Sequence, residues 1–156
     1  MKSFNEWLIS EIMDQNQNIL KDTPTNKLVK WTMPDIQREM DELQRTAETF
    51  NIDLNNLIQA TKSSRLVPLD ETTWRSMKNT DSYGIKKGDM KTVNSLGSGY
   101  GRDVGKIFEA FQQGGTLPAP IVLMQNNKPY LVGGNTRLMV ARAMGVQPMI
   151  LKVVLD

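Results

Sequence analysis

The N-terminal part of the chain has the hydrophobic pattern of amphipathic helices. Apolar residues recur at steps of three and four over residues 3–15 and 32–50, which is the spacing of one face of an α-helix. A capping aspartate precedes a third helix predicted over residues 54–61, and a short helix is expected around residues 27–31. We therefore predict an α-helical extension over residues 1–62.

The second of these helices carries a single apolar stripe on an otherwise charged surface. Thr32 can cap this helix, and Pro34 suits its first turn. The stripe is too short to define a coiled coil, so we expect it to pack on the rest of the protein, with a homodimer seam as the alternative. The stripe consists of Ile36, Met40, Leu43, Ala47 and Phe50.

The pattern changes to a mixture of strands and helices after residue 62. Residues 65–69 read as a short strand, and Pro68 places this strand at a sheet edge because proline cannot donate a ladder hydrogen bond. Residues 79–102 show little periodicity and many glycines. A helix predicted over residues 104–113 follows and ends at a glycine pair.

The last third of the chain predicts a hairpin, a helix and a strand. The hairpin pairs residues 121–124 with residues 130–132 around the turn-forming "QNNKP". A helix over residues 135–144 and the apolar run "PMILKVVL" follow. These elements predict an α+β fold over residues 63–156, with a small mixed sheet and packed helices.

Composition limits the chemistry that this chain can carry. The chain has no histidine and no cysteine, which excludes cysteine nucleophiles, thiolate metal sites and the commonest general base. Carboxylates, hydroxyls, Lys/Arg, backbone amides or an oxygen-bound ion such as Mg²⁺ are left, which favours phosphate chemistry or none. No signal peptide and no apolar run of about 20 residues is recognisable. We therefore expect a cytoplasmic protein with no membrane partner.

Charge is distributed unevenly along the sequence. Acids outnumber bases in residues 1–62, whereas bases outnumber acids in residues 63–156. No acid occurs between Glu109 and Asp156, although this stretch holds Lys128, Arg137, Arg142 and Lys152. Core strands are poor in every charge, which explains part of this gap but not the common sign. The C-terminal part is therefore the better candidate for binding an anion.

The sequence "VGGNTRL" combines the features of an anion site at a helix start. Gly133 and Gly134 let another group approach the backbone, and Asn135 can cap the helix. Thr136 adds a hydroxyl donor, and Arg137 adds a bidentate fork suited to phosphate. Alternatively, the glycines only make a tight strand-to-helix turn and Arg137 points into solvent. The local sequence leaves both interpretations open.

The block from Val104 to Val154 resembles the ParB/sulfiredoxin superfamily. The resemblance rests on a helix ending in glycine, the strand "PIVL", an apolar strand leading into a Gly-X-X-Arg helix start, and a final strand. In that superfamily the helix start binds nucleotide phosphates, either of CTP in partitioning ParB proteins or of ATP in sulfiredoxin and free-serine kinases. The resemblance therefore implies ATP or CTP as ligand, bound by Gly133, Gly134, Asn135, Thr136 and Arg137.

Two departures narrow what the resemblance implies. Asn135 stands where sulfiredoxin needs a cysteine, so that activity is not expected. Asn-Thr-Arg replaces the Glu-Arg-Arg of partitioning ParB proteins, and no helix-turn-helix domain follows Asp156, so a partition clamp is not expected either. What remains are the lone-domain members, which include phosphotransferases and the ParB-like nucleases often found in phage and mobile elements.

Asp70 and Glu71 are the best candidates for a catalytic base or a Mg²⁺ ligand. The alternative for Asp70 is a capping role at "DETTW". Trp74 and Tyr130 could stack on a base, although burial is the more common role of such residues.

These features lead to three hypotheses for the function. The first is a nucleotide-phosphate-binding protein that acts as a Mg²⁺-dependent phosphotransferase or nucleotide hydrolase. The second is a non-catalytic DNA-, RNA- or partner-binding module, and the third is a ParB-like nuclease. A nuclease without histidine needs clustered acids around a metal ion, which the acid-free stretch makes harder.

Overall fold

The structure is a computed structural model that describes residues 29–93 and 104–155. The helix predicted over residues 3–15 lies outside these ranges, as does the end of the irregular segment. The chain divides into two compact units. The described residues of the first unit are 29–31, 81–93, 104–117 and 136–148, and those of the second unit are 32–80, 118–135 and 149–155.

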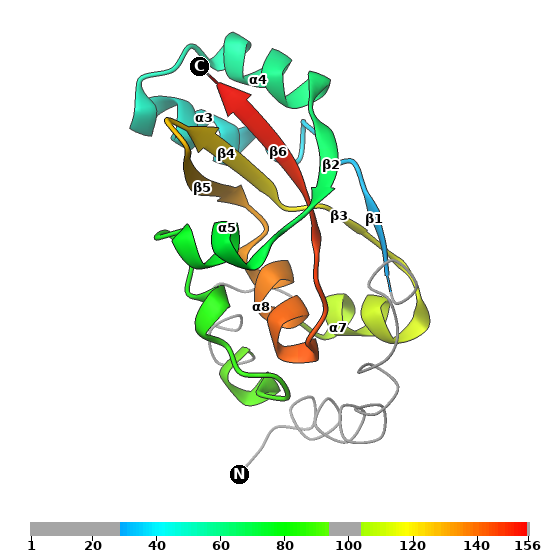
Figure 1. The fold of residues 1–156 in the computed structure, drawn as a ribbon. Coiled ribbons are helices and arrows are strands. Elements are labelled where there is room, and N and C mark those ends of the chain that lie inside the picture. Colours follow the sequence, from blue (N-terminus) through cyan, green and yellow to red (C-terminus); the bar gives the residue numbers. More distant parts are fainter. Residues whose placement is uncertain (1–28, 94–103, 156) are drawn as a thin grey trace. The chain divides into compact units, whose positions relative to one another are not determined.

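The second unit is built on a mixed four-stranded sheet with the strand order β2-β6-β4-β5 (Figure 1). Strand β2 pairs antiparallel with β6, β6 pairs parallel with β4, and β4 pairs antiparallel with β5. The predicted edge position of the Pro68 strand is confirmed, since β2 is the outermost strand on its side. The strands are β2 (Arg65–Pro68), β4 (Ile121–Gln125), β5 (Lys128–Gly133) and β6 (Met149–Leu155).

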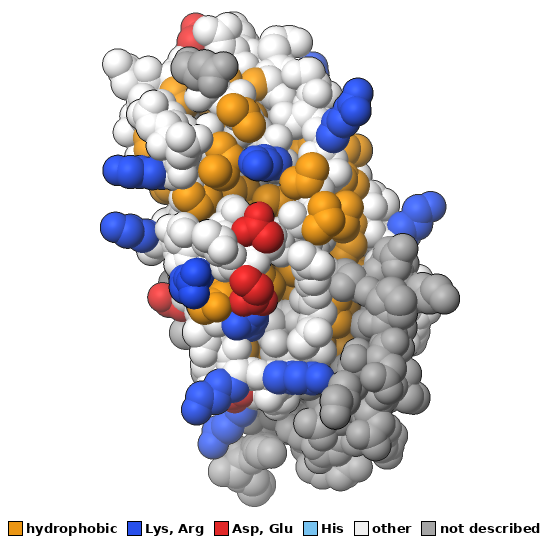
Figure 2. Space-filling model, viewed as in Figure 1, with side chains coloured by type: hydrophobic (Ala, Val, Ile, Leu, Met, Phe, Trp, Pro, Cys, Tyr) orange, Lys and Arg blue, Asp and Glu red, His pale blue; other side chains and the backbone are white. Residues whose placement is uncertain are grey.

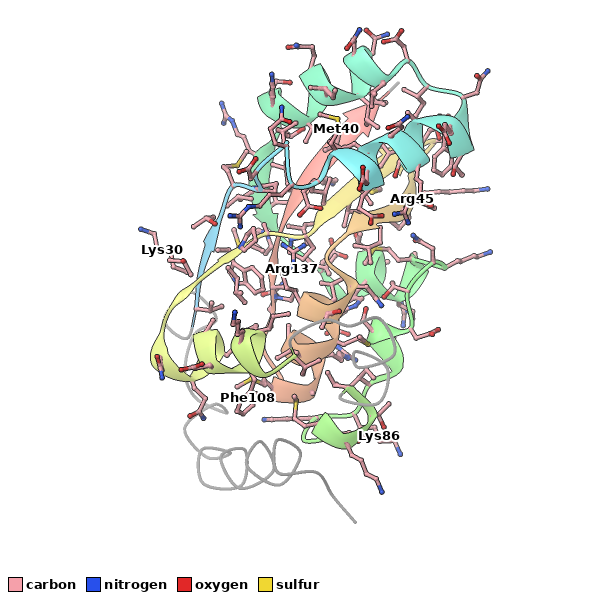
Figure 3. The ribbon with its side chains drawn as sticks, turned by 180° about the vertical axis from the view of Figure 1, so that it is seen from behind. Lys30, Met40, Arg45, Lys86, Phe108 and Arg137 are labelled. Carbon is pink, nitrogen blue, oxygen red and sulfur yellow. The ribbon has the colours of Figure 1, made fainter. Side chains whose placement is uncertain are left out.

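Helices α3 (Met40–Phe50) and α4 (Leu54–Ser63) pack against one face of this sheet. Figures 1 and 3 show them on the same side of the strands. Leu43, Ala47 and Leu57 are buried against Ile121, Leu123, Val132, Leu151 and Val153 of the sheet. The expected packing of the α3 stripe on the protein is thus confirmed. The helices predicted as an extension share a core with strands from the end of the chain, while the domain boundary at residue 62 stays a prediction.

The start predicted for the second helix was too early. Residues 36–39 form a turn, and α3 begins at Met40. The Asp35 carboxylate accepts the Gln37 amide hydrogen at 2.9 Å, a local bond that favours a turn over a continuous helix. Asp53 caps α4 as predicted, because its side chain accepts the Asn56 amide hydrogen at 3.0 Å.

The opposite face of the sheet carries apolar and basic side chains together. Figure 2 shows hydrophobic side chains beside lysine and arginine side chains over the strands. Val154 is 56% exposed on β6, next to the exposed Lys152. Buried and exposed residues alternate over residues 151–154 of β6, so one face of the strand packs on the core and the other contacts water.

The β4–β5 hairpin closes with two asparagines, as the turn residues predicted. Asn126 has φ 53° and Asn127 has φ 62°, the left-handed values of a two-residue hairpin turn. At the outer edge of β5, the Asn79 amide donates to the Leu131 carbonyl at 2.7 Å and accepts the Leu131 amide hydrogen at 2.9 Å. One side chain thus takes both outward backbone groups of Leu131.

The first unit contains helix α7 (Val104–Gln113) and the short 3₁₀ helix η1 (Ser82–Gly84). It also contains most of helix α8 (Asn135–Met144) and of strands β1 (Lys30–Thr32) and β3 (Thr116–Pro118). β1 and β3 pair as a two-stranded sheet. The short helix expected at residues 27–31 was wrong at Lys30 and Trp31, since the Lys30 amide donates to the Gly115 carbonyl at 2.8 Å. Trp31 then packs edge-on against Phe111.

The observed architecture is of the α+β class that the sequence predicted. Helices 104–113 and 135–144, the hairpin and the final strand all form within a residue or two of the expected bounds. Among the described residues, no helix has the length and apolar character needed to cross a membrane.

Candidate phosphate-binding site

Helix α8 is entered through a glycine that no other residue can replace without strain. Gly134 has φ +107°, a conformation that side chains disfavour. A Cβ added there would lie 2.6 Å from the Pro120 Cβ and 2.8 Å from the Pro120 Cα. Pro120 leads into β4, so its backbone position is fixed by the sheet. The turn into α8 therefore requires glycine for both backbone and packing reasons.

The neighbouring Gly133 lies against an acidic side chain. A Cβ at this position would be 2.8 Å from Oε2 of Glu39, which precedes α3. The sequence suggested that the two glycines leave room for a phosphate. In the structure the protein's own Glu39 and Pro120 lie beside them. An anion at this site is therefore better placed over the first turn of α8 than over Gly133.

Asn135 and Thr136, which follow the two glycines, have side chains in different surroundings. The α8 helix begins at Asn135 itself rather than after it. The Asn135 Oδ1 atom accepts a hydrogen bond from the Thr80 hydroxyl at 2.6 Å, so this side chain is tied to the end of another segment. Thr136 is only 3% exposed. Its hydroxyl is therefore less accessible to a ligand than the sequence suggested.

Arg137 lies on the first turn of α8 and is half-buried (Figure 3). That turn holds no acidic residue. A helix start carries partial positive charge from its backbone amides, and an arginine on the same turn adds to it. Arg137 thus adds positive charge to the first turn of α8, while Gly133, Gly134 and Asn135 have contacts within the chain.

The predicted catalytic acids open helix α5 (Glu71–Ser76) in the second unit. The Asp70 carboxylate accepts the Thr73 amide hydrogen at 2.7 Å, and the bonds from Thr73 hold the pKa of Asp70 below its usual value. This is the capping role that the sequence left as an alternative. Glu71 is exposed on the first turn. Trp74 is buried, so it packs rather than stacks on a ligand.

The acids and the glycine turn share the second unit. Helix α5 packs against β5, the strand that ends at Gly133. A metal site is not evident in the described residues, which contain no group of three or more acids that could hold an ion. A Mg²⁺ ion at Asp70 or Glu71 would have to take further ligands from substrate or water, as Mg²⁺ commonly does.

A second concave region was missed by sequence reasoning. We name it the hairpin groove. It is lined by residues 49–51 at the end of α3, by Ser76 at the end of α5 with Lys78 and Asn79 after it, and by residues 125–130 of the β4–β5 hairpin. The run "QNNKPY" was predicted as a turn with a strand after it, and Tyr130 was named only as a residue that could stack on a base. Its density of amide, basic and aromatic side chains was the available signal.

Comparisons of the chain with protein-family models, with curated proteins and with solved structures gave no match. The resemblance to the ParB/sulfiredoxin superfamily accordingly rests on the residues quoted for it, and it supports a proposal rather than an assignment.

Proposed function

We propose that this chain binds nucleotide phosphates at the start of α8, as a ParB/sulfiredoxin-fold protein, and that it acts as a Mg²⁺-dependent phosphotransferase or nucleotide hydrolase on ATP or CTP. One observation carries the binding step. Helix α8 begins directly after the left-handed Gly134, with Arg137 and no acid on its first turn. The order of elements from α7 to β6 also agrees with the resemblance.

Physical chemistry favours phosphate at such a helix start. The first backbone amides of a helix have no acceptor within the helix, and they point along the positive end of its dipole. The Arg137 guanidinium offers a planar pair of donors that matches two phosphate oxygens. Glu39 beside Gly133 repels an anion from that side. A phosphate would accordingly bind over residues 135–137, closer to Arg137 than to the glycines.

The catalytic step needs a proton acceptor or a metal-bound phosphate. Because the pKa of Asp70 is lowered, its carboxylate is ionised at neutral pH and is a weak proton acceptor. This favours Asp70 as a Mg²⁺ ligand and Glu71 as the base. The second unit holds both residues together with Gly133 and Gly134.

Binding is tested by titrating ATP, CTP and a short DNA into wild-type protein, Arg137→Ala and Arg45→Ala, with and without Mg²⁺. Arg45 is the matched control, because its side chain is 71% exposed on α3. Charge-assisted bonds contribute roughly 1.5–3 kcal/mol, so Arg137→Ala should weaken nucleotide binding by about 10- to 100-fold. Equal nucleotide affinities of Arg137→Ala and wild type would refute the site.

Catalysis is tested separately from binding. Phosphate release or transfer should disappear in Glu71→Gln while nucleotide affinity stays within about threefold of wild type. Binding without turnover in wild type would leave a nucleotide sensor in place of an enzyme. Saturable binding of DNA alone, lost in Arg137→Ala, would instead support the non-catalytic nucleic-acid hypothesis at the same helix start.

A further inference from the structure

The hairpin groove is a second candidate binding site, separate in position from the start of α8. It lies at the Lys128 end of β5, whereas α8 follows the Gly133 end of that strand. Its volume is about 1040 Å³, and all of its lining residues belong to the second unit. Small-molecule pockets range from roughly 300 to 1,000 Å³. The groove is thus large enough for a segment of an extended polymer.

The charge of the groove is one-sided. Lys78 and Lys128 both line it and are exposed, and its lining contains no aspartate or glutamate. Lysine at an open groove attracts anions and gives affinity that falls with salt. Nothing in the lining repels a chain of phosphates.

Two aromatic rings form the apolar part of the groove. Phe50 and Tyr130 meet edge to face, with ring centroids 4.8 Å apart, and both are half-buried. Their inner sides pack on the sheet core. Rings anchored in this way keep part of their surface for a ligand, and aromatic side chains that line a basic groove are the usual platform for unpaired bases.

Residues with side-chain amides line the groove together with the two rings, and their backbone conformations are well defined. Asn126 and Asn127 form the tight hairpin turn, and Asn51 ends α3 at φ 53°. Asn79 is fixed by its two bonds to Leu131. Amide groups both donate and accept hydrogen bonds, which suits the edges of nucleobases. The backbone positions of these amides are thus set before a ligand binds.

We propose that the hairpin groove binds a short stretch of single-stranded nucleic acid, with bases against Phe50 and Tyr130 and phosphates beside Lys78 and Lys128. An oligosaccharide would use the rings and amides but not the two lysines. An acidic peptide would use the lysines but not the rings and amides together. A single-stranded nucleic acid uses all three groups at once.

The test measures fluorescence anisotropy of labelled oligo-dT and oligo-U of about 12 nucleotides, between roughly 50 and 200 mM salt. The variant is Lys78→Glu with Lys128→Glu. The matched control is Lys62→Glu with Lys86→Glu, which changes the net charge equally at exposed positions outside the groove. We expect the groove variant to lose about 10- to 100-fold in affinity and the control to lose about threefold or less.

Further measurements distinguish binding in the hairpin groove from binding at the start of α8. Arg137→Ala should leave oligonucleotide binding unchanged, and AMP at equal concentration should not displace the oligonucleotide. Tyr130→Leu should weaken binding about tenfold and Tyr130→Phe should not, provided that thermal melting shows both variants folded. Absence of oligonucleotide binding, equal losses in the two double variants, loss in Arg137→Ala, or displacement by AMP would each overturn the proposal.

Discussion

Helices α5 and α8 begin with opposite electrostatic arrangements. At α5 the Asp70 carboxylate accepts the Thr73 amide hydrogen, and Glu71 adds a second negative charge on the first turn. At α8 a glycine with φ +107° precedes the first turn, which holds Arg137 and no acid. The first arrangement places negative charge at the helix start, whereas the first turn of α8 itself holds none. This contrast supports the proposal that a phosphate binds at the start of α8 and not at the start of α5.

The largest effect is expected from the backbone of the α8 turn. Gly134→Ala should lower the free energy of unfolding by about 3 kcal/mol, because alanine is strained at this φ and its Cβ would collide with Pro120. Gly84→Ala is the control, since nothing lies within 4 Å of a Cβ there. Chemical denaturation measures both variants. A Gly134→Ala protein as stable as Gly84→Ala would contradict the requirement for glycine.

Asn135→Asp would make the start of α8 resemble that of α5. The new carboxylate can still accept the Thr80 hydroxyl hydrogen, and its charge should stabilise the helix by about 0.5 kcal/mol. Nucleotide affinity should nevertheless fall by about tenfold, measured by calorimetric titration. Asn55→Asp on the first turn of α4 is the matched control and should leave affinity unchanged. Unchanged affinity in Asn135→Asp would place the phosphate elsewhere.

Removal of the cap of α5 should have a smaller effect on stability. Asp70→Ala should cost about 1 kcal/mol of unfolding free energy, because it removes the acceptor for the Thr73 amide hydrogen. Asp70→Asn keeps an acceptor and should cost clearly less. Thermal melts of the two variants check this difference. Equal losses would mean that charge, and not the capping bond, stabilises α5.

The smallest effect is a pH dependence from the same carboxylate. The folded-state pKa of Asp70 is lowered from 3.8, so its stabilisation is present above that value and is lost as pH falls through the lowered pKa. The stability difference between wild type and Asp70→Asn should therefore shrink below about pH 4. Bonds from Thr92 lower the pKa of Asp89 in the same way. Because Asp89 is present in both proteins, its pH dependence is common to them. A difference that grows on acidification would contradict this sign.

Local chemistry made much of the fold predictable from sequence. The Asn126–Asn127 turn, the Asp53 cap and the apolar alternation of β6 each depend on near neighbours in the chain. The strand at Lys30 and Trp31 was missed because it forms through pairing with β3, which lies far away in the sequence. The late start of α3 was missed because Pro34 suits a turn as well as a helix.

The positive charge at the start of α8 was predictable from the sequence, but the residues packed around it were not. Arg137 on an acid-free first turn follows from the sequence alone. The positions of Glu39 beside Gly133, Pro120 beside Gly134 and Thr80 on Asn135 follow only from tertiary packing. No local pattern specifies them. The hairpin groove was missed for the same reason, because three segments distant in sequence form it.

The Asn79 bonds to Leu131 also bear on how the protein behaves at high concentration. A bare strand edge can recruit a strand of another molecule, which is a common first step of aggregation. Along β5, Leu131 is already paired by a side-chain amide, and Pro129, two residues earlier on the same side of the strand, has no amide hydrogen to offer. Asn79 thus pairs two backbone groups that a neighbouring strand would otherwise pair, which leaves fewer open groups at this edge for another molecule.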